Sequence, residues 1–101
     1  MNFSIKHDTK AKKFFTVIGG KECSLKYDKI NDFLLDYKLL YVPKNLRGQG
    51  VGNRILEHAF NYAKRNMIKI KPSCSYVGGF LDSHTQYLEL VYDRTSLTPA
   101  Q

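Results

Sequence analysis

The chain is poor in the residues and segments that mark several special classes of protein. Its 101 residues contain no tryptophan, three prolines and only two cysteines, Cys23 and Cys74, whose wide separation suggests neither a zinc-binding pair nor a disulfide framework. No apolar run approaches the ~20 residues that a membrane-spanning helix needs, and residues 1–13 lack the apolar stretch of a signal peptide. We therefore expect a cytoplasmic protein with no membrane segment and no metal centre.

Acidic residues are also scarce, which leaves a net charge of +7. Fifteen of the sixteen lysines and arginines lie at or before Lys71, against six of the nine acidic residues. Such a basic region would suit a polyphosphate ligand or nucleic acid, although many surface lysines do no more than keep a protein soluble. Hydrophobic content of 43% and charged content of 25% are globular values. We expect one domain over residues 1–94 and a frayed tail over residues 95–101.

The first half of the chain has the pattern of β-strands. Residues 3–7, 14–18 and 23–27 alternate or are rich in β-branched and aromatic side chains, and Gly19-Gly20 predicts a two-residue hairpin turn. A polar turn is expected over residues 28–32. Residues 33–42 are nearly all apolar, which predicts a long central strand that is covered on both faces over part of its length.

The second half predicts helices around one further strand. Residues 51–66 have helical spacing, with an apolar face made of Val51, Ile55, Leu56, Ala59, Phe60, Ala63 and Met67. A short strand over residues 67–70 should end before Pro72, and Ser73 or Ser75 should cap a helix that runs to about His84. Residues 85–92 fit a helical turn or a strand. The order β-β-β-β-α-β-α predicts an α/β (α+β) fold with a mixed, mostly antiparallel sheet and one parallel β-α-β unit.

A glycine-rich loop, Arg47-Gly48-Gln49-Gly50-Val51-Gly52, joins the fourth strand to the first helix. Glycines let the backbone approach a ligand, and the free amides and dipole of a helix N-terminus attract anions. Asn53 and Arg54, in the first turn, could face a bound phosphate. The loop matches neither the P-loop nor the dinucleotide fingerprint. The alternative is an ordinary turn that begins a helix.

This loop resembles the Gln/Arg-x-x-Gly-x-Gly/Ala motif of the GNAT superfamily of acetyl-CoA-dependent N-acetyltransferases, where it also follows the fourth strand. The match is closer to a branch whose members are about as long as this chain. Members of that branch share Val-Pro, then Leu-Arg-Gly-x-Gly-Ile-Gly, a cysteine after the fifth strand with a nearby aromatic residue, and a later histidine with a tyrosine. The corresponding residues here are Val42-Pro43, Leu46 to Gly52, Cys74 with Tyr76, and His84 with Tyr87.

The resemblance implies that the protein binds acetyl-CoA or coenzyme A and acetylates an amine, which the sequence does not identify. It also implies that amides from Gln49 to Asn53 hold the pyrophosphate, that the strand end near Leu40 to Val42 pairs with the pantetheine arm, and that the thioester lies beside Cys74. The expected cofactor-binding residues are Tyr41, Val42, Arg47, Gly48, Gln49, Gly50, Val51, Gly52, Asn53, Arg54, Cys74 and Tyr76.

Acetyl transfer requires an aligned amine, a donor to the developing oxyanion and a base. A backbone amide near Tyr41 or Val42 could be the donor. Cys74 is the one plausible nucleophile or acid, since a helix N-terminus lowers a thiol's pKa; otherwise it is a small buried residue. His84 could be a base or could orient Cys74, or it could simply cap a helix.

Other candidates have simpler interpretations. Tyr76 could contact the acetyl or pantetheine group or pack in the core. We expect Cys23 to be a packing residue, and His7 and His58 to be surface residues without partners.

The chain departs from the branch at two places. Many members carry a histidine and a glutamate just before Val-Pro, where this chain has Leu39 and Tyr41, so a base from that strand is missing. Gly78-Gly79 is also unusual. One alternative function is therefore a coenzyme A-binding module with little transferase activity. A basic nucleic-acid binder is less expected, because no RNP-like or helix-turn-helix signature is present. The sequence sets no oligomeric state.

Overall fold

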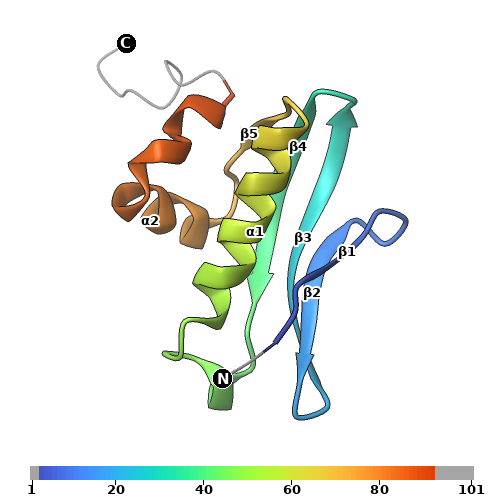
Figure 1. Ribbon diagram of the computed structural model, residues 1–101, viewed down its shortest axis with the longest axis vertical. Coiled ribbons are helices and arrows are strands. Elements are labelled where there is room, and N and C mark those ends of the chain that lie inside the picture. Colours follow the sequence, from blue (N-terminus) through green and yellow to red (C-terminus); the bar gives the residue numbers. More distant parts are fainter. Residues whose placement is uncertain (1–2, 93–101) are drawn as a thin grey trace.

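The computed structural model describes residues 3–92, which form a five-stranded sheet with helices packed on one face (Figure 1). The chain runs in the order β1 (Lys6–Asp8), β2 (Lys13–Ile18), β3 (Lys21–Asn31), β4 (Leu34–Tyr41), the 3-10 helix η1 (Lys44–Leu46), α1 (Val51–Arg65), β5 (Lys69–Lys71), α2 (Ser75–Ser83) and the 3-10 helix η2 (Thr85–Leu90). None of these helices is long and apolar enough to cross a membrane. The predicted tail, residues 95–101, lies outside the described residues.

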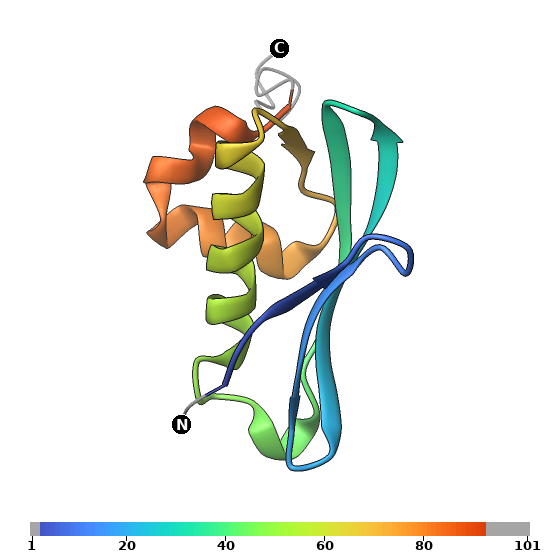
Figure 2. The ribbon, with the colours of Figure 1, turned by 45° about the vertical axis from the view of Figure 1, so that its right-hand side comes forward.

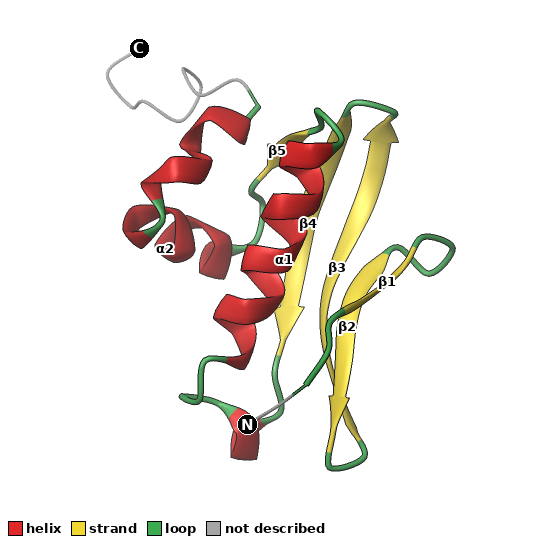
Figure 3. Ribbon diagram, viewed as in Figure 1, coloured by secondary structure: helices red, strands yellow, loops and turns green. Residues whose placement is uncertain are grey.

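The strands lie in the sheet in the order in which they occur in the chain. β1 to β4 pair antiparallel, and β5 pairs parallel with β4 after α1 has crossed over the sheet (Figure 3). Ile18 lies opposite Lys21, and Gly19 and Gly20 have φ values of +58° and +78°. Positive φ at both central residues is the geometry of a type I′ hairpin turn. The predicted mixed sheet, parallel β-α-β unit and two-residue hairpin are confirmed.

The core lies between α1 and the sheet. α1 buries the predicted face except Met67, against fully buried side chains that include Phe14, Leu25 and Tyr37. The hydroxyl of Tyr37 donates to the carbonyl oxygen of Ala59 at 2.8 Å, which fixes the height of the helix over β4. α2 and η2 pack beside α1, and the turned view in Figure 2 shows α1 and α2 on the same face of the sheet.

Several predicted strand boundaries are wrong, because pairing with a neighbouring strand decides where a strand begins and ends. β1 is Lys6–Asp8 rather than residues 3–7, and β5 begins at Lys69 rather than residue 67. The turn expected over residues 28–32 is strand as far as Asn31, because Asp28 and Lys29 pair with β4. Hydrogen bonding to the neighbouring strand keeps these polar residues extended, because strand preference depends on the partner strand more than on local composition. Residues 85–92, for which a helical turn or a strand was expected, contain η2.

Four predicted side-chain environments, including that of His58, are also wrong. Met67 is 84% exposed, because α1 ends at Arg65 and Met67 reverses the chain with a φ of +56°. Neither Ser73 nor Ser75 caps α2, whose N-cap is Cys74 with no side-chain cap bond. His7 is not a free surface residue: its Nε2 lies 2.6 Å from the Tyr27 hydroxyl, and its ring stacks on Phe14.

His58 is also partly buried. Its ring packs edge-on against the ring of Phe14, with the ring centroids 5.9 Å apart. Desolvation lowers the pKa of both His7 and His58 below the usual range, and the charge of His58 lowers that of His7 further.

Candidate functional site

The glycine loop ends at the uncapped N-terminus of α1. Gly50 is the N-cap with a φ of +82°, Gly48 has a φ of +79°, and these left-handed values favour glycine. The first helical hydrogen bond runs from the Arg54 amide to the Gly50 carbonyl oxygen. No side chain caps the helix, and its first turn holds no acidic residue. Among residues 3–92, no group accepts from the amides of Val51, Gly52 and Asn53. Unpaired amides of this kind form an anion-binding site.

A β-bulge in β4 decides which side chains face this loop. Tyr27 pairs with Tyr37 and Lys26 pairs with Leu39, which leaves Lys38 as the extra residue. Side chains in a regular strand alternate between faces, but a bulge resets the alternation. As a result, both Tyr37 and Leu40 point toward α1, although they are three residues apart.

The bulge turns Leu39 and Tyr41 to the opposite face, where they are 54% and 50% exposed. A Cβ built on Gly52 would lie 3.1 Å from Cδ2 of Leu40, so the first turn of α1 packs closely on the strand. Glycine at this position lets the helix N-terminus and the strand end approach each other.

β4 and β5 separate just before the bulge. Their pairing covers Leu34 to Asp36 on β4, and the amide of Cys74 then donates to the carbonyl oxygen of Tyr37 at 3.0 Å. That is the last backbone hydrogen bond between β4 and the β5–α2 segment in the described part of the chain. The remainder of β4 is therefore an unpaired edge on this side, and α2 begins where the two strands part.

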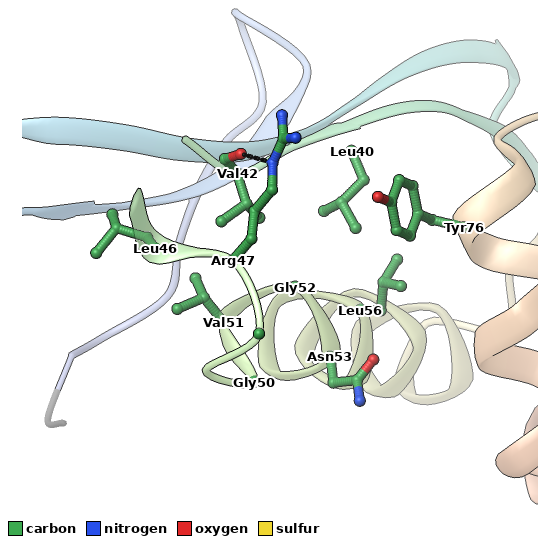
Figure 4. Close-up of a pocket in the computed structure, with 11 residues that line it drawn as sticks. Leu40, Val42, Leu46, Arg47, Gly50, Val51, Gly52, Asn53, Leu56 and Tyr76 are labelled. Atoms are coloured by element: carbon green, nitrogen blue, oxygen red, sulfur yellow. Dashed lines mark hydrogen bonds between the residues drawn. The ribbon is translucent and has the colours of Figure 1, made fainter. Parts of the chain in front are cut away.

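The loop, the strand end and α2 together surround a pocket of about 260 Å³. Figure 4 shows Leu40 from β4 and Val42 just after it, Gly50 to Asn53 from the start of α1, and Tyr76 from α2 around the same space. Its lining residues are Leu40, Val42, Leu46, Arg47, Gly48, Gly50, Val51, Gly52, Asn53, Leu56 and Tyr76. One end of the pocket thus offers free amides, and the other end is apolar.

Eight of the predicted cofactor residues line this pocket: Val42, Arg47, Gly48, Gly50, Val51, Gly52, Asn53 and Tyr76. Nε of Arg47 donates to the Val42 carbonyl oxygen at 2.8 Å and ties the loop to the strand end. Tyr76 is 62% exposed, so it is not a core residue. Leu46 and Leu56 also line the pocket, although no ligand contact was predicted for either. Leu56 was predicted only as part of the apolar face of the helix.

Four predicted cofactor residues are not among the lining residues of the pocket: Tyr41, Gln49, Arg54 and Cys74. Tyr41 faces the opposite side of the sheet. Gln49 donates from its side chain to the Asn45 carbonyl oxygen at 3.2 Å. The role predicted for Gln49 belongs to its backbone amide, in the loop between Gly48 and Gly50. The guanidinium of Arg54 lies over the Phe3 ring, 4.4 Å from its centroid, instead of facing the loop. The long side chain of Arg54 reaches the N-terminal segment, where an aromatic ring attracts the cation.

The two candidate catalytic residues are held apart. Cys74 precedes α2 and His84 follows it, so ten helical steps separate their Cα atoms by about 15 Å along the helix axis. His84 stacks on Phe80 with ring centroids 4.0 Å apart, and its Nδ1 faces the Phe80 carbonyl oxygen at 2.9 Å. Facing an acceptor, Nδ1 carries the proton. His84 therefore does not orient Cys74. Cys74 itself is 8% exposed and belongs to the core cluster, and Cys23 is fully buried as expected.

The comparisons with known proteins agree with this arrangement. A family model described as GCN5-related N-acetyl-transferase matches residues 13–90, which include the sheet from β2 onward, the loop and both helices. The fold is similar to the NMR solution structure of a GCN5-like protein from Staphylococcus aureus, described as a candidate N-acetyltransferase. The two chains are 24% identical, with a TM-score of 0.69, over 87% of this chain and 86% of that chain. This chain belongs to the GCN5-related N-acetyltransferase family.

Proposed function

We propose that the protein transfers an acetyl group from acetyl-CoA to an amine. The observation that supports this most directly is the uncapped N-terminus of α1, whose free amides face a pocket that is apolar at its other end. The amides of Val51, Gly52 and Asn53 would hold the pyrophosphate, with the helix dipole adding about half a positive charge. The net charge of +7 favours the same polyanion.

The remainder of the donor would follow the strand. Beyond Tyr37 the edge of β4 has free backbone groups, which suits an amide-containing chain such as pantetheine. Leu40 and Leu56 provide apolar contacts beside that edge, and Tyr76 covers the pocket from α2. The acetyl group would then lie near the gap between β4 and β5, close to the start of α2.

Acetyl-CoA supplies an acetyl group activated as a thioester. In the transfer, the amine nitrogen bonds to the acetyl carbon while the carbon–sulfur bond breaks, the nitrogen loses a proton, and the leaving thiolate takes one up. A backbone amide near Tyr41 or Val42 would donate to the carbonyl oxygen. We assign Cys74 as the acid that protonates the thiolate, because it is the N-cap of α2 at the point where the strands part.

A coenzyme A-binding module with little turnover is the second candidate. Leu39 and Tyr41 offer no carboxylate or imidazole, and they face away from the pocket. His84 is turned toward Phe80. No base is therefore evident beside Cys74 among the described side chains, and an acceptor amine that is already neutral would be required. Multiple-turnover assays with amines distinguish this candidate from an enzyme.

Thermal melting with and without acetyl-CoA tests the proposal. Ligand at ~100 times its dissociation constant stabilises the folded state by ~2.7 kcal/mol, which for a domain of this size raises the Tm by on the order of ten degrees or more. Asn53→Glu is the informative variant, because a carboxylate in the first turn favours the free helix by about 0.3–1 kcal/mol but repels a pyrophosphate. Asn53→Gln is its uncharged control.

We expect Asn53→Glu to melt at or above the temperature of the unmodified protein and to lose most of the acetyl-CoA shift, while Asn53→Gln keeps it. No shift of the unmodified protein at millimolar acetyl-CoA would contradict the proposal. Mass spectrometry after incubation with acetyl-CoA then examines Cys74. An acetyl label that disappears in Cys74→Ala would make the thiol a nucleophile instead of an acid.

A further inference from the structure

A second depression lies on the face of the sheet opposite α1. We call it the outer groove; it measures about 880 Å³ and is lined by residues that include Lys21, Ser24, Lys26, Leu39, Tyr41 and Lys44. Figure 2 shows that α1 and α2 lie on the other face of the sheet; the 3-10 helix η1 contributes Lys44 to the groove. The outer groove shares none of its lining residues with the pocket beside the glycine loop.

The charges of the outer groove are mostly unbalanced. Lys21, Lys26 and Lys44 are exposed, and none of them forms an ion pair with another residue of the range 3–92. Glu22 also lines the groove, but Nζ of Lys13 holds both of its carboxylate oxygens, at 2.9 and 3.0 Å. The groove therefore presents a net positive field to a ligand, which selects for anionic groups.

The floor of the outer groove is apolar. Leu39 lies opposite Lys26 and Tyr41 lies opposite Ser24 in the ladder between β3 and β4, so an aliphatic and an aromatic side chain lie among the lysines. Small molecules bind in enclosed pockets that bury most of their surface, whereas this groove lies open on the sheet. An extended peptide with acidic and apolar side chains fits this combination.

The two depressions use opposite faces of the same four residues. Leu40 and Val42 line the pocket on one face, and Leu39 and Tyr41 line the outer groove on the other. This strand segment forms no backbone hydrogen bond on its β5 side in the described part of the chain, and its two faces line the two depressions. An amine held in the outer groove would therefore approach this edge of the strand from the face opposite the acetyl donor.

We propose that the outer groove binds an acidic peptide segment that presents the acceptor amine. This inference rests on the proposed acetyl transfer, and it adds the class of acceptor. The transferred acetyl group ends on an amine of that segment, with the same proton and bond changes as in the transfer described above.

Two labelled peptides of equal length test the inference by fluorescence anisotropy at low salt. One carries a single lysine flanked by glutamates and leucine, and in the other the glutamates are glutamines. Lys26→Glu and Lys21→Glu reverse charges in the outer groove. Lys10→Glu makes the same change of net charge in the exposed β1–β2 turn and is the matched control. Thermal shift with acetyl-CoA is measured on every variant.

We expect the acidic peptide to bind at least tenfold more tightly than its glutamine counterpart. Each groove reversal should weaken that binding about fivefold or more, because an exposed attraction of up to ~1 kcal/mol becomes a repulsion. Lys10→Glu should change it less than twofold. The acidic peptide should also gain an acetyl group faster than the glutamine peptide when acetyl-CoA is added.

The outcomes separate this inference from the proposed function. An acetyl-CoA shift together with equal binding and acetylation of both peptides would overturn the acidic acceptor and leave the transferase. Groove-dependent peptide binding without an acetyl-CoA shift would overturn the acceptor role as well as the transferase. Tighter, groove-dependent binding of a single-stranded uridine 12-mer would overturn the assignment to a peptide.

Discussion

Gly50 and Gly79 are expected to respond in opposite directions to the same substitution. Gly50 is the N-cap of α1 with a φ of +82°, whereas Gly79 lies inside α2 without a positive φ. A Cβ added at either position has no neighbour within 4 Å. Steric contacts therefore do not contribute, and the difference between Gly50→Ala and Gly79→Ala isolates the backbone conformation.

The magnitudes follow from the two backbone states. An alanine at positive φ costs about 1–2 kcal/mol, only part of which is offset by the lower entropy of the unfolded chain, so Gly50→Ala should destabilise by about 1 kcal/mol. Alanine within a helix is better than glycine by about 0.5–1 kcal/mol, so Gly79→Ala should stabilise by that amount. Each 1 kcal/mol corresponds to roughly 4–8 °C in the Tm of a domain of this size.

Urea unfolding and thermal melting of the two variants measure this difference. We expect the free energies of unfolding to lie about 1.5–2 kcal/mol apart, with the unmodified protein between them. If both variants shift in the same direction, or if Gly50→Ala is not destabilised, the conformation described for the loop is wrong. Acetyl-CoA should stabilise Gly79→Ala as much as the unmodified protein, and Gly50→Ala less.

Two further predictions concern Tyr37 and His7. Tyr37→Phe removes the hydroxyl that donates to the Ala59 carbonyl oxygen, and it should lower the free energy of unfolding, measured by urea denaturation, by about 0.5–1.5 kcal/mol. Tyr41→Phe, at a half-exposed position, is the control and should leave that free energy unchanged. Equal effects of the two substitutions would contradict the buried hydrogen bond. The pKa of His7 is lower in the folded state than in the unfolded chain. As the pH falls below about 6.5, the unfolded chain therefore binds the proton first, and the folded state loses stability. Above that pH the contribution of His7 to stability is complete. Between about pH 7.5 and 5, His7→Gln should make the free energy of unfolding less dependent on pH, and an unchanged slope would exclude His7 as a source.

Local patterns were sufficient for most of the fold. The spacing of Val51, Ile55, Leu56 and Ala59 is helical whatever surrounds it, and Gly19-Gly20 permits a turn that few other pairs adopt. The glycine loop between a strand and a helix likewise predicts an anion site, because it needs only neighbouring residues and the amides of one helix.

Residues distant in the chain decided the rest. The sequence contains no signal for the bulge at Lys38, which arises where β4 must pair with β3 on one side while Tyr37 reaches Ala59 on the other. His7 acquires Tyr27 as a partner only when β1 and β3 lie in the same sheet. Arg54 likewise turns to Phe3, which precedes β1.

The sequence by itself determined the β-β-β-β-α-β-α order and the position of the glycine loop, because periodicity and glycine conformation are properties of consecutive residues. Only the tertiary structure decided to which face of the sheet each of Leu39, Leu40, Tyr41 and Val42 points, and hence which of them line the pocket and which the outer groove. The physical reason is that side chains of a strand change faces at every residue, so a single bulge, set by pairing with another strand, reverses them all.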